Sequence, residues 1–474
     1  MEKTLGYDKT SIQSIFNYST KLIGHSLREV VDADTIASSY LQGQGKGGLE
    51  HMIESLFFKY PINSDPGPDF SEAGLELKGT GLKELKSGEY QIKERLVCDM
   101  IDYMNVVNEN FETSLFYIKS RIMLLIFYLY KKGVNKLDLK FIYTVLWRLP
   151  EKDLLIIRHD FETIVNKIKR GEAHLLSEGD TEYLGACRKG QKGDSPRQQP
   201  FSDILAPRRA FSLKPAYMRT VLSYVKEQGT PAVSNFEIET NNDELVSIDD
   251  LKNKTFEDII LKRFEDFIGQ SYQNIASLKD VDLSKKPKNK FALIANAIAS
   301  SEKCPNVNRS EEFLKAGLTM KTIRVSANGN IKEAMSFENI DYLEIAECDE
   351  WYDSRLYELF SNRFMFVVFK EQTPKEEDFI LSDVFFWTMP ETDLNGAEQY
   401  WDHIRDVVLK NKISDENWWK AKDRKKFHVR PKATKATDLA PTPQGGFAKK
   451  FCYWFNNDYV REIINNRNLE NEYK

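Results

Sequence analysis

The sequence is poor in the residues that build zinc sites, disulfide frameworks and histidine-based catalytic centres. Its 474 residues include only six histidines and five cysteines. The number of cysteines is odd, and no two of them stand at metal-ligand spacing, so neither a zinc site nor a disulfide framework is indicated. Reduced thiols are typical of the cell interior, and we therefore expect a cytoplasmic protein. The cysteines are Cys98, Cys187, Cys304, Cys348 and Cys452.

Long apolar runs and a positive net charge are also missing. The longest apolar run, Ile122–Tyr130, is too short to span a bilayer and suits a buried strand. The first residues, Met1–Thr4, contain no apolar signal core. The formal net charge is −5, so a nucleic-acid-binding protein of this composition must concentrate its basic residues locally.

The chain has ample material for a core, with 41% hydrophobic residues, and its length predicts two or three domains. Helical periodicity covers residues 8–31 and 49–60. A glycine-rich loop that contains Lys46 opens the second of these helices, a geometry that suits a phosphate contact. It lacks the Lys-Ser/Thr ending of a nucleotide-binding P-loop. Helices interspersed with strands predict an α/β fold with sheets flanked by helices; the strands are expected at residues 74–78, 95–98, 122–130, 364–369 and 385–388.

The two halves of the chain resemble each other at an offset of about 240 residues. Among the ordered matches, Gly74–Lys78 corresponds to Gly317–Lys321, and Phe111–Ser114 to Trp351–Ser354. Between the halves, residues 227–254 are acidic and poor in apolar residues, which is typical of a linker. We therefore expect two tandem domains, residues 1–226 and 255–474, joined by this linker.

The repeat also indicates what the second copy has lost. Glu76 aligns with Thr319, and Glu54 aligns with Asn296 or its neighbour. Asp69 aligns with Glu312, and Lys78 with Lys321. A site with fewer carboxylates holds a divalent metal poorly, so the second domain is expected to be catalytically silent.

The intact copy carries a PD-(D/E)xK pattern. Asp69 and Glu76 offer hard oxygen ligands for Mg²⁺, and Glu54 on the preceding helix adds a third carboxylate. Lys78 follows Glu76 by two residues, so both side chains lie on the same face of a strand. An ammonium group there would orient the attacking water or stabilise charge on the phosphate. The pattern predicts Mg²⁺-dependent phosphodiester hydrolysis.

The residues around this pattern resemble those of a known family. The stretches 46–54, 69–78, 95–98 and 112–114 resemble MutH, and the chain resembles still more closely the MutH-related type II restriction endonucleases of the Sau-3A type, which cut at GATC. The resemblance implies catalytic roles for Asp69, Glu76, Lys78 and Glu54, and a further active-site lysine at Lys119. It also implies a C-terminal domain that binds DNA as a regulator, and a cognate methyltransferase in the host. Ser212 stands where MutH has a tyrosine in the part that senses adenine methylation. The resemblance therefore does not extend to a MutH-like response to methylated adenine.

Two basic segments interrupt the acidic chain at equivalent places in the repeat. Residues 188–219 hold eight basic against two acidic side chains, and residues 422–435 hold seven against one. Such segments suit phosphate contacts. The tripeptides that begin at Cys187 and Arg430 match the Arg-Pro-Lys loop of MutH, which favours base contacts by their lysines. The predicted DNA-binding residues are Lys46, Arg188, Lys189, Arg209, Ser212, Lys214, Arg430 and Lys432.

The leading interpretation is a type II restriction endonuclease that acts on double-stranded DNA at GATC. GATC is a palindrome, and one chain has one active site. We therefore expect a second copy of the chain on the DNA during double-strand cleavage. Two alternatives remain at this stage, a MutH-like mismatch-repair nickase and a non-catalytic DNA-binding regulator. The duplicated length argues against the first, and the intact motif argues against the second.

Overall fold

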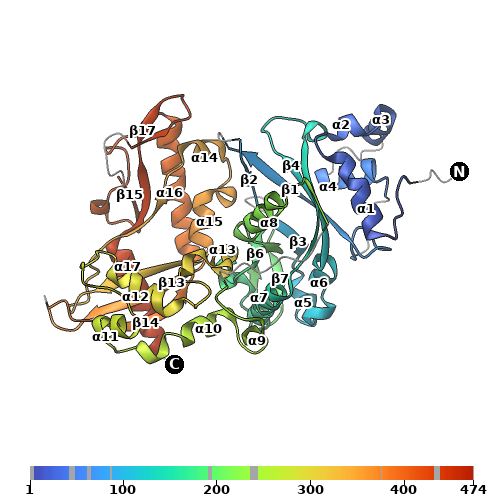
Figure 1. Ribbon diagram of the computed structural model, residues 1–474. Helices are drawn as coiled ribbons and strands as arrows, with labels where there is room; N and C mark the ends of the chain where they lie inside the picture. The colour runs from blue at the N-terminus through green and yellow to red at the C-terminus, as the bar shows by residue number, and fades with distance from the viewer. Residues whose placement is uncertain are drawn as a thin grey trace. The chain divides into compact units, whose positions relative to one another are not determined.

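Figure 1 shows the computed structural model, coloured from blue at the N-terminus to red at the C-terminus. It describes residues 5–41, 48–60, 66–85, 88–189, 195–234, 244–374, 376–431 and 438–472. The chain divides into two compact units. The first comprises residues 1–242, 246–255 and 314–317, and the second comprises residues 243–245, 256–313 and 318–474. Each unit combines a mixed sheet with helices, which confirms the α/β fold.

A mixed sheet forms the centre of the first unit. In the described residues its strands lie in the order β10-β5-β4-β1-β2, with β1 and β4 parallel and β4 and β5 antiparallel. A smaller sheet, β3-β9-β6, and a hairpin of β7 and β8 complete the unit. The strands are β1 Glu76–Glu84, β2 Tyr90–Ile92, β3 Leu96–Met100, β4 Ile122–Leu129, β5 Phe141–Arg148, β6 Leu184–Arg188, β7 Arg197–Gln199, β8 Ser202–Ala206, β9 Arg209–Leu213 and β10 Ala232–Val233.

The core of this unit lies between the central sheet and the N-terminal helices. Ile15 of α1 and Met52 of α4 share one apolar cluster with Leu77 of β1 and Leu124 of β4. Burial of each such side chain stabilises the fold by about 1.5–3 kcal/mol. The helices are α1 Ile12–Ser19, α2 Leu27–Val30, α3 Ala33–Leu41, α4 Leu49–Met52, α5 Tyr103–Val106, α6 Leu115–Ser120, α7 Glu151–Lys169, α8 Pro215–Glu227 and α9 Ile248–Leu251.

The second unit repeats the plan of the first in a reduced form. Its described strands make the sheets β11-β13-β14 and β12-β18-β15 and the hairpin β16-β17. The strands are β11 Thr319–Val325, β12 Met335–Asn339, β13 Phe364–Glu371, β14 Phe379–Trp387, β15 Phe427–Pro431, β16 Leu439–Pro441, β17 Phe447–Lys449 and β18 Phe451–Phe455. The helices are α10 Phe256–Lys262, α11 Tyr272–Leu278, α12 Lys290–Ala299, α13 Glu311–Ala316, α14 Tyr342–Glu347, α15 Arg355–Ser361, α16 Glu391–Leu409 and α17 Asn457–Glu472.

The element order confirms the internal repeat. The helices α7 and α16 each have 19 residues and each follow a proline N-cap. Ser114 and Ser354 cap the N-termini of α6 and α15 in the same way, by accepting a hydrogen bond from the backbone three residues on. The strand registers agree as well, because Glu76 lies opposite Met123 whereas Thr319 lies opposite Phe364, and both partners pair with a tryptophan on the next strand.

Other expectations have mixed outcomes. The predicted linker contains two regular elements: β10 pairs with β5, and α9 is helical. Residues 235–243, its most acidic part, lie outside the described residues. None of the five cysteines, all of them described and buried, forms a disulfide. No helix in the described parts of the chain is long and apolar enough to cross a membrane.

Candidate active site

The two carboxylates of the motif lie side by side at the start of β1. The backbone N–H of Asp69 donates to Glu76 Oε2 at 3.2 Å, and the backbone N–H of Leu77 donates to Asp69 Oδ2 at 2.9 Å. A tight turn makes this possible, because Phe70 and Leu75 form a β-bridge and Gly74 between them has a φ of +65°. That conformation favours glycine. The local sequence therefore fixes the position of Asp69 relative to Glu76.

Two lysines converge on Glu76. Lys78 Nζ lies 2.7 Å from Glu76 Oε1, which confirms that the two side chains share a face of the strand. Lys119, from the end of α6, places its Nζ 3.4 Å from the same oxygen and 3.8 Å from Asp99 Oδ1 on β3. The structure therefore brings together Asp69, Glu76, Lys78 and Lys119 from three separate elements.

The helix before the motif supplies further carboxylates. Glu54 lies in a π-helical turn, Ile53–Phe57, that continues α4; such turns are frequent at functional sites. Glu50 lies one turn earlier, and its Oε1 accepts a hydrogen bond from Gly79 N at 2.8 Å. A Cβ on Gly79 would lie 3.1 Å from Glu50 Cγ, so a larger residue there would push this side chain by a few tenths of an ångström.

The electrostatics of this cluster favour a bound cation. Glu54 is buried, and burial raises its pKa to about 7, with further contributions from the negative charges of Asp69 and Glu76. Burial also raises the pKa of Glu76, although Lys78 opposes this shift. The pKa of Lys78 is raised, because the charges of Glu76 and Glu50 outweigh the effect of its burial. Lys78 is therefore an ammonium group at neutral pH.

The carboxylates of this site fit a Mg²⁺ ion whose remaining ligands come from water and from the phosphates of the substrate. In the described residues, no three histidine, cysteine, aspartate or glutamate side chains converge closely enough to hold a metal by themselves. Mg²⁺ usually keeps several waters and binds through one or two carboxylates together with substrate phosphates. Asp69 and Glu76 match this requirement, with Glu54 beside them.

The equivalent place in the second unit has a different set of contacts. Thr319 occupies the position of Glu76, and the register of α15 places Leu359 at that of Lys119. Glu312 keeps a carboxylate where the first unit has Asp69, but it is fully buried and accepts hydrogen bonds from Leu245 N at 3.0 and 3.2 Å. Both of its carboxylate oxygens thus lie within hydrogen-bond distance of this one backbone N–H.

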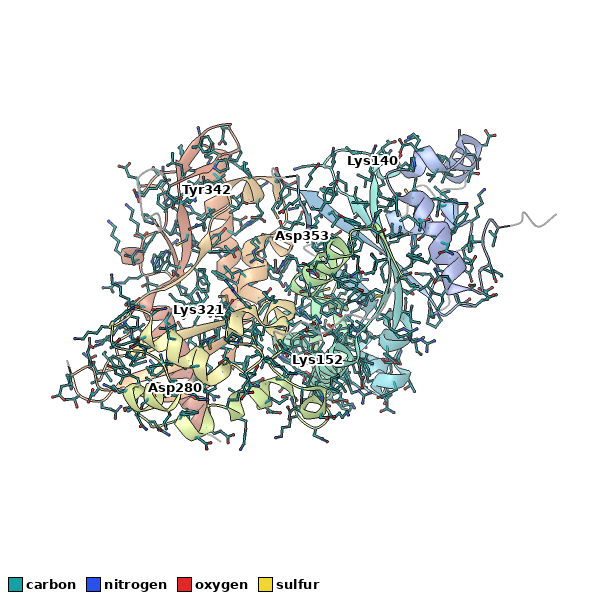
Figure 2. The ribbon with its side chains drawn as sticks, viewed as in Figure 1. Lys140, Lys152, Asp280, Lys321, Tyr342 and Asp353 are labelled. Carbon is teal, nitrogen blue, oxygen red and sulfur yellow. The ribbon has the colours of Figure 1, made fainter. Side chains whose placement is uncertain are left out.

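The other charged residues at this place in the second unit also form contacts within the protein. Lys321, labelled in Figure 2, donates from Nζ to the backbone oxygen of Ser336 at 2.8 Å and lies over the ring of Phe337. Glu338, which matches Asp99 in the strand register, receives two hydrogen bonds from Arg355 at 2.8 and 2.9 Å. This arrangement replaces the carboxylate and lysine cluster of the first unit with internal structural contacts.

The predicted DNA-reading strands occupy equivalent positions in the two units. Cys187 on β6 pairs with Ala210, and Arg430 on β15 pairs with Cys452 of the corresponding strand. Arg188 ends β6 and is partly exposed, and Lys189 follows it. Arg430 is exposed, and its guanidinium lies 5.0 Å from the ring centroid of Trp454. Lys46 and Lys432 lie outside the described residues.

Three of the predicted DNA-binding residues, Arg209, Ser212 and Lys214, are buried in this structure. Arg209 Nη1 donates to Ala186 O at 2.7 Å, and Lys214 Nζ donates to Thr181 O at 2.5 Å. Ser212 Oγ lies 3.5 Å from Gly185 O. Arg209 and Ser212 belong to β9, whose residues are buried on both faces of the sheet, and Lys214 is the N-cap residue of α8 directly after it. We expect them to position β6.

Sequence reasoning missed Glu50 and Asp99. Glu50 precedes Glu54 by four residues, so helical spacing alone places both on one side of the helix. Asp99 carries a weaker signal, because the strand expected at residues 95–98 extends to Met100.

Comparisons with known proteins agree with this geometry. The DNA mismatch repair enzyme MutH family matches residues 58–160 and again residues 303–399, once in each unit. The DNA mismatch repair protein MutH of Buchnera aphidicola subsp. Baizongia pistaciae is 23% identical over 37% of this chain and 79% of its own length. The fold and the site thus define a MutH-like nuclease with tandem domains.

The type II restriction enzyme Sau3AI of Staphylococcus aureus is 32% identical over 95% of this chain and 98% of its own length. The chain belongs to the family of that restriction enzyme, and it is a site-specific deoxyribonuclease.

Proposed function

We propose that this restriction endonuclease cleaves both strands of DNA at GATC in a Mg²⁺-dependent reaction, with catalysis in the first unit. The observation that carries the proposal is the convergence of Lys78 and Lys119 on Glu76 beside Asp69, together with its replacement in the second unit. The GATC target rests on the resemblance to restriction enzymes of the Sau-3A type.

Each residue of the first site has a distinct chemical task. Asp69 and Glu76 would hold Mg²⁺, which polarises the scissile phosphate and lowers the pKa of a bound water. Lys78 is charged and stands beside Glu76, where it stabilises negative charge that develops on the phosphate. Lys119 contacts the same glutamate and Asp99, and it keeps these carboxylates in place for the reaction.

The second unit acts as a DNA-binding regulator in this proposal. It retains an exposed arginine at the equivalent of the DNA-reading loop, and it lacks the carboxylate cluster. Binding of a second GATC site would stabilise the active arrangement in proportion to its preference for that state. Residues 1–226 and 255–474 are the proposed catalytic and regulatory domains, and residues 227–254 connect them.

One active site in each chain has a consequence for double-strand cleavage. Both strands of a palindrome must meet a site of the same hand, so two chains pair transiently on the DNA. A cognate methyltransferase would protect the host DNA. These partners follow from the proposed reaction.

A plasmid assay tests the function directly. Supercoiled plasmid that contains several GATC sites is incubated with the full chain, with Mg²⁺ or with EDTA. Linear fragments with ends at GATC, formed only with Mg²⁺, are expected. Nicked circles alone would indicate a nickase, and unchanged plasmid would indicate a non-catalytic DNA-binding protein. Either result would reject the proposed reaction.

A further inference from the structure

Among the residues that the structure describes, each unit has one largely exposed phenylalanine on the equivalent hairpin of its fold. Phe201 is 74% exposed at the turn between β7 and β8, and Phe447 is 73% exposed at the start of β17, just after the turn that follows β16. Both hairpins lie in the chain between the strand that carries the basic tripeptide, β6 or β15, and its pairing partner, β9 or β18. A single exposed apolar side chain is ordinary, whereas one on the equivalent hairpin of each unit points to a shared role.

The first hairpin is held rigidly while its phenylalanine remains outside. The buried side chain of Gln199 donates from Nε2 to Ile204 O at 2.5 Å and accepts from Ala173 N at 2.7 Å. At the tip, a Cβ on Gly171 would lie 2.6 Å from Phe201 O, so the turn is pressed against the segment that follows α7. Phe201 itself has a φ of +62°, in the left-handed region that a bulky side chain rarely adopts.

The second hairpin is attached to the corresponding helix. Gln444, in the turn between β16 and β17, donates from Nε2 to Val408 O at 3.1 Å and Leu409 O at 3.2 Å, at the end of α16. Because α16 corresponds to α7, both hairpins are fastened to the same end of the same helix in the repeat. Leu439, at the start of β16 in the second hairpin, is also exposed.

The surroundings of the first hairpin fit a polyanion. A hollow of about 600 Å³ next to β7 is lined by Arg197 and Arg208, and by Arg209, whose guanidinium is held by Ala186 O; Asp102 is its one acidic lining residue. Met100 and Met104, which are 44% and 52% exposed, also line it. Lys189 also joins this region, because its backbone N–H donates to Arg208 O at 2.9 Å. Guanidinium groups beside an aromatic side chain favour phosphates and bases over an apolar protein face.

We propose that Phe201 and Phe447 are aromatic prongs that enter the groove of bound DNA and partly unstack a base step beside the recognition sequence. Apolar side chains that unstack a step make a kink, which lets the DNA contact more of the protein. The inference deepens the proposed function and rests on DNA binding by both units. It assigns to the two hairpins a recognition role separate from that of the basic tripeptides.

The test uses GATC duplexes that carry 2-aminopurine at successive flanking positions, in EDTA so that the DNA stays intact. The wild-type chain should raise the 2-aminopurine emission at one flanking step. Phe201→Ala and Phe447→Ala should each reduce this rise and bind roughly 5- to 100-fold more weakly, as expected for loss of one aromatic–base stack. The double variant should abolish the rise and bind more weakly than either single variant. Phe201→Trp should retain the rise, with tryptophan emission quenched by the DNA.

The controls separate the possible failures. Val134→Ala and Leu278→Ala remove side chains that are 41% and 60% exposed away from the hairpins, and they should leave emission and affinity unchanged. A double variant that still produces the full emission rise at full affinity would overturn the prongs. The proposal would also be overturned if the double variant kept its emission rise and its affinity for DNA but lost self-association, measured by sedimentation. If either of these results were found and the wild-type chain still cut plasmid at GATC, the proposed function would stand and only the aromatic prongs would be rejected. If the wild-type chain did not cut plasmid at GATC, the proposed function itself would be rejected.

Discussion

The same strand position carries opposite chemistry in the two units. In the first unit, β1 begins with Glu76, and two lysines reach its carboxylate. In the second unit, β11 begins with Thr319, and the lysine two residues later is bound to a backbone oxygen. The backbone plan is nearly unchanged, with the same pairing and the same capping serine. A fold of this kind therefore tolerates both an active and an inactive site, because the site depends on a few side chains grafted onto the strand.

The largest difference should come from Glu76. Changing Glu76→Gln removes a ligand charge from the site, and the several kcal/mol that a metal contributes correspond to a loss of cleavage on the order of 10³-fold or more. The matched change Thr319→Ala should leave the rate unaltered. Single-turnover cleavage of a GATC duplex measures both. Comparable losses in the two variants would reject the assignment of catalysis to the first unit alone.

Lys78 and Lys321 form the next matched pair. Lys78→Ala should lower the rate on bound DNA by roughly 10²-fold, with little change in affinity, because the lysine acts mainly in the transition state. Lys321→Ala should leave the rate unchanged and cost about 1 kcal/mol of stability, from the lost hydrogen bond to Ser336. Rapid-quench kinetics, binding by anisotropy and urea unfolding separate these effects. If Lys78→Ala lost affinity and kept its rate, Lys78 would be a phosphate anchor.

The regulatory role of the second unit predicts a smaller effect. A plasmid with two GATC sites should be cut roughly 5-fold or more faster than a plasmid with one, within the usual range of coupling free energies. Arg430→Ala should remove this difference while it leaves the slow single-site rate intact. Lys262→Ala, at an exposed cation on α10 paired with Glu265, is a control outside the basic tripeptide and outside the hollow around Arg430. Equal rates on the two plasmids, unaffected by an added GATC duplex, would contradict regulation.

The smallest expected effect concerns the proton on Glu54. Its pKa is raised from its ordinary 4.5 to about 7, chiefly by burial. The folded protein therefore holds this proton more tightly than the unfolded chain, and the metal-free protein should lose stability as the pH rises through this window. Burial raises the pKa of Asp160 to about 7 as well, so Glu54→Gln should reduce the slope, and the slope that Asp160 contributes should remain.

Thermal unfolding in EDTA at about pH 5 and about pH 8 checks this prediction. Added Mg²⁺ should restore stability at the higher pH in the wild type and less in Glu54→Gln. A pH slope as steep in the variant as in the wild type would contradict the role of Glu54.

Several features of this protein follow from neighbouring residues alone. The placement of Glu76 and Lys78 on one face is a consequence of the two-residue period of a strand, and the structure confirms it. The apolar run at residues 122–130 becomes the buried strand β4. The repeat was visible because ordered matches at one offset survive even where the chemistry has changed. The loss of Glu76 and Glu54 from the second copy could be read in the same way.

Other features depended on contacts between distant segments. Lys119 reaches Glu76 only because α6 leads into β4, which pairs with β1. Glu50 became part of the site through the amide of Gly79, which no local pattern indicates.

Which basic residues are buried and which are accessible is likewise decided only in the folded chain. Arg209 and Lys214 lie in or directly after a strand that is buried on both faces, whereas Arg188 and Arg430 lie at or near the ends of their strands and remain accessible. Charge along the sequence determines how many cations a segment carries. The neighbours of each strand in the sheet determine which of those cations reach solvent, because burial is set by strands that are far apart in the sequence.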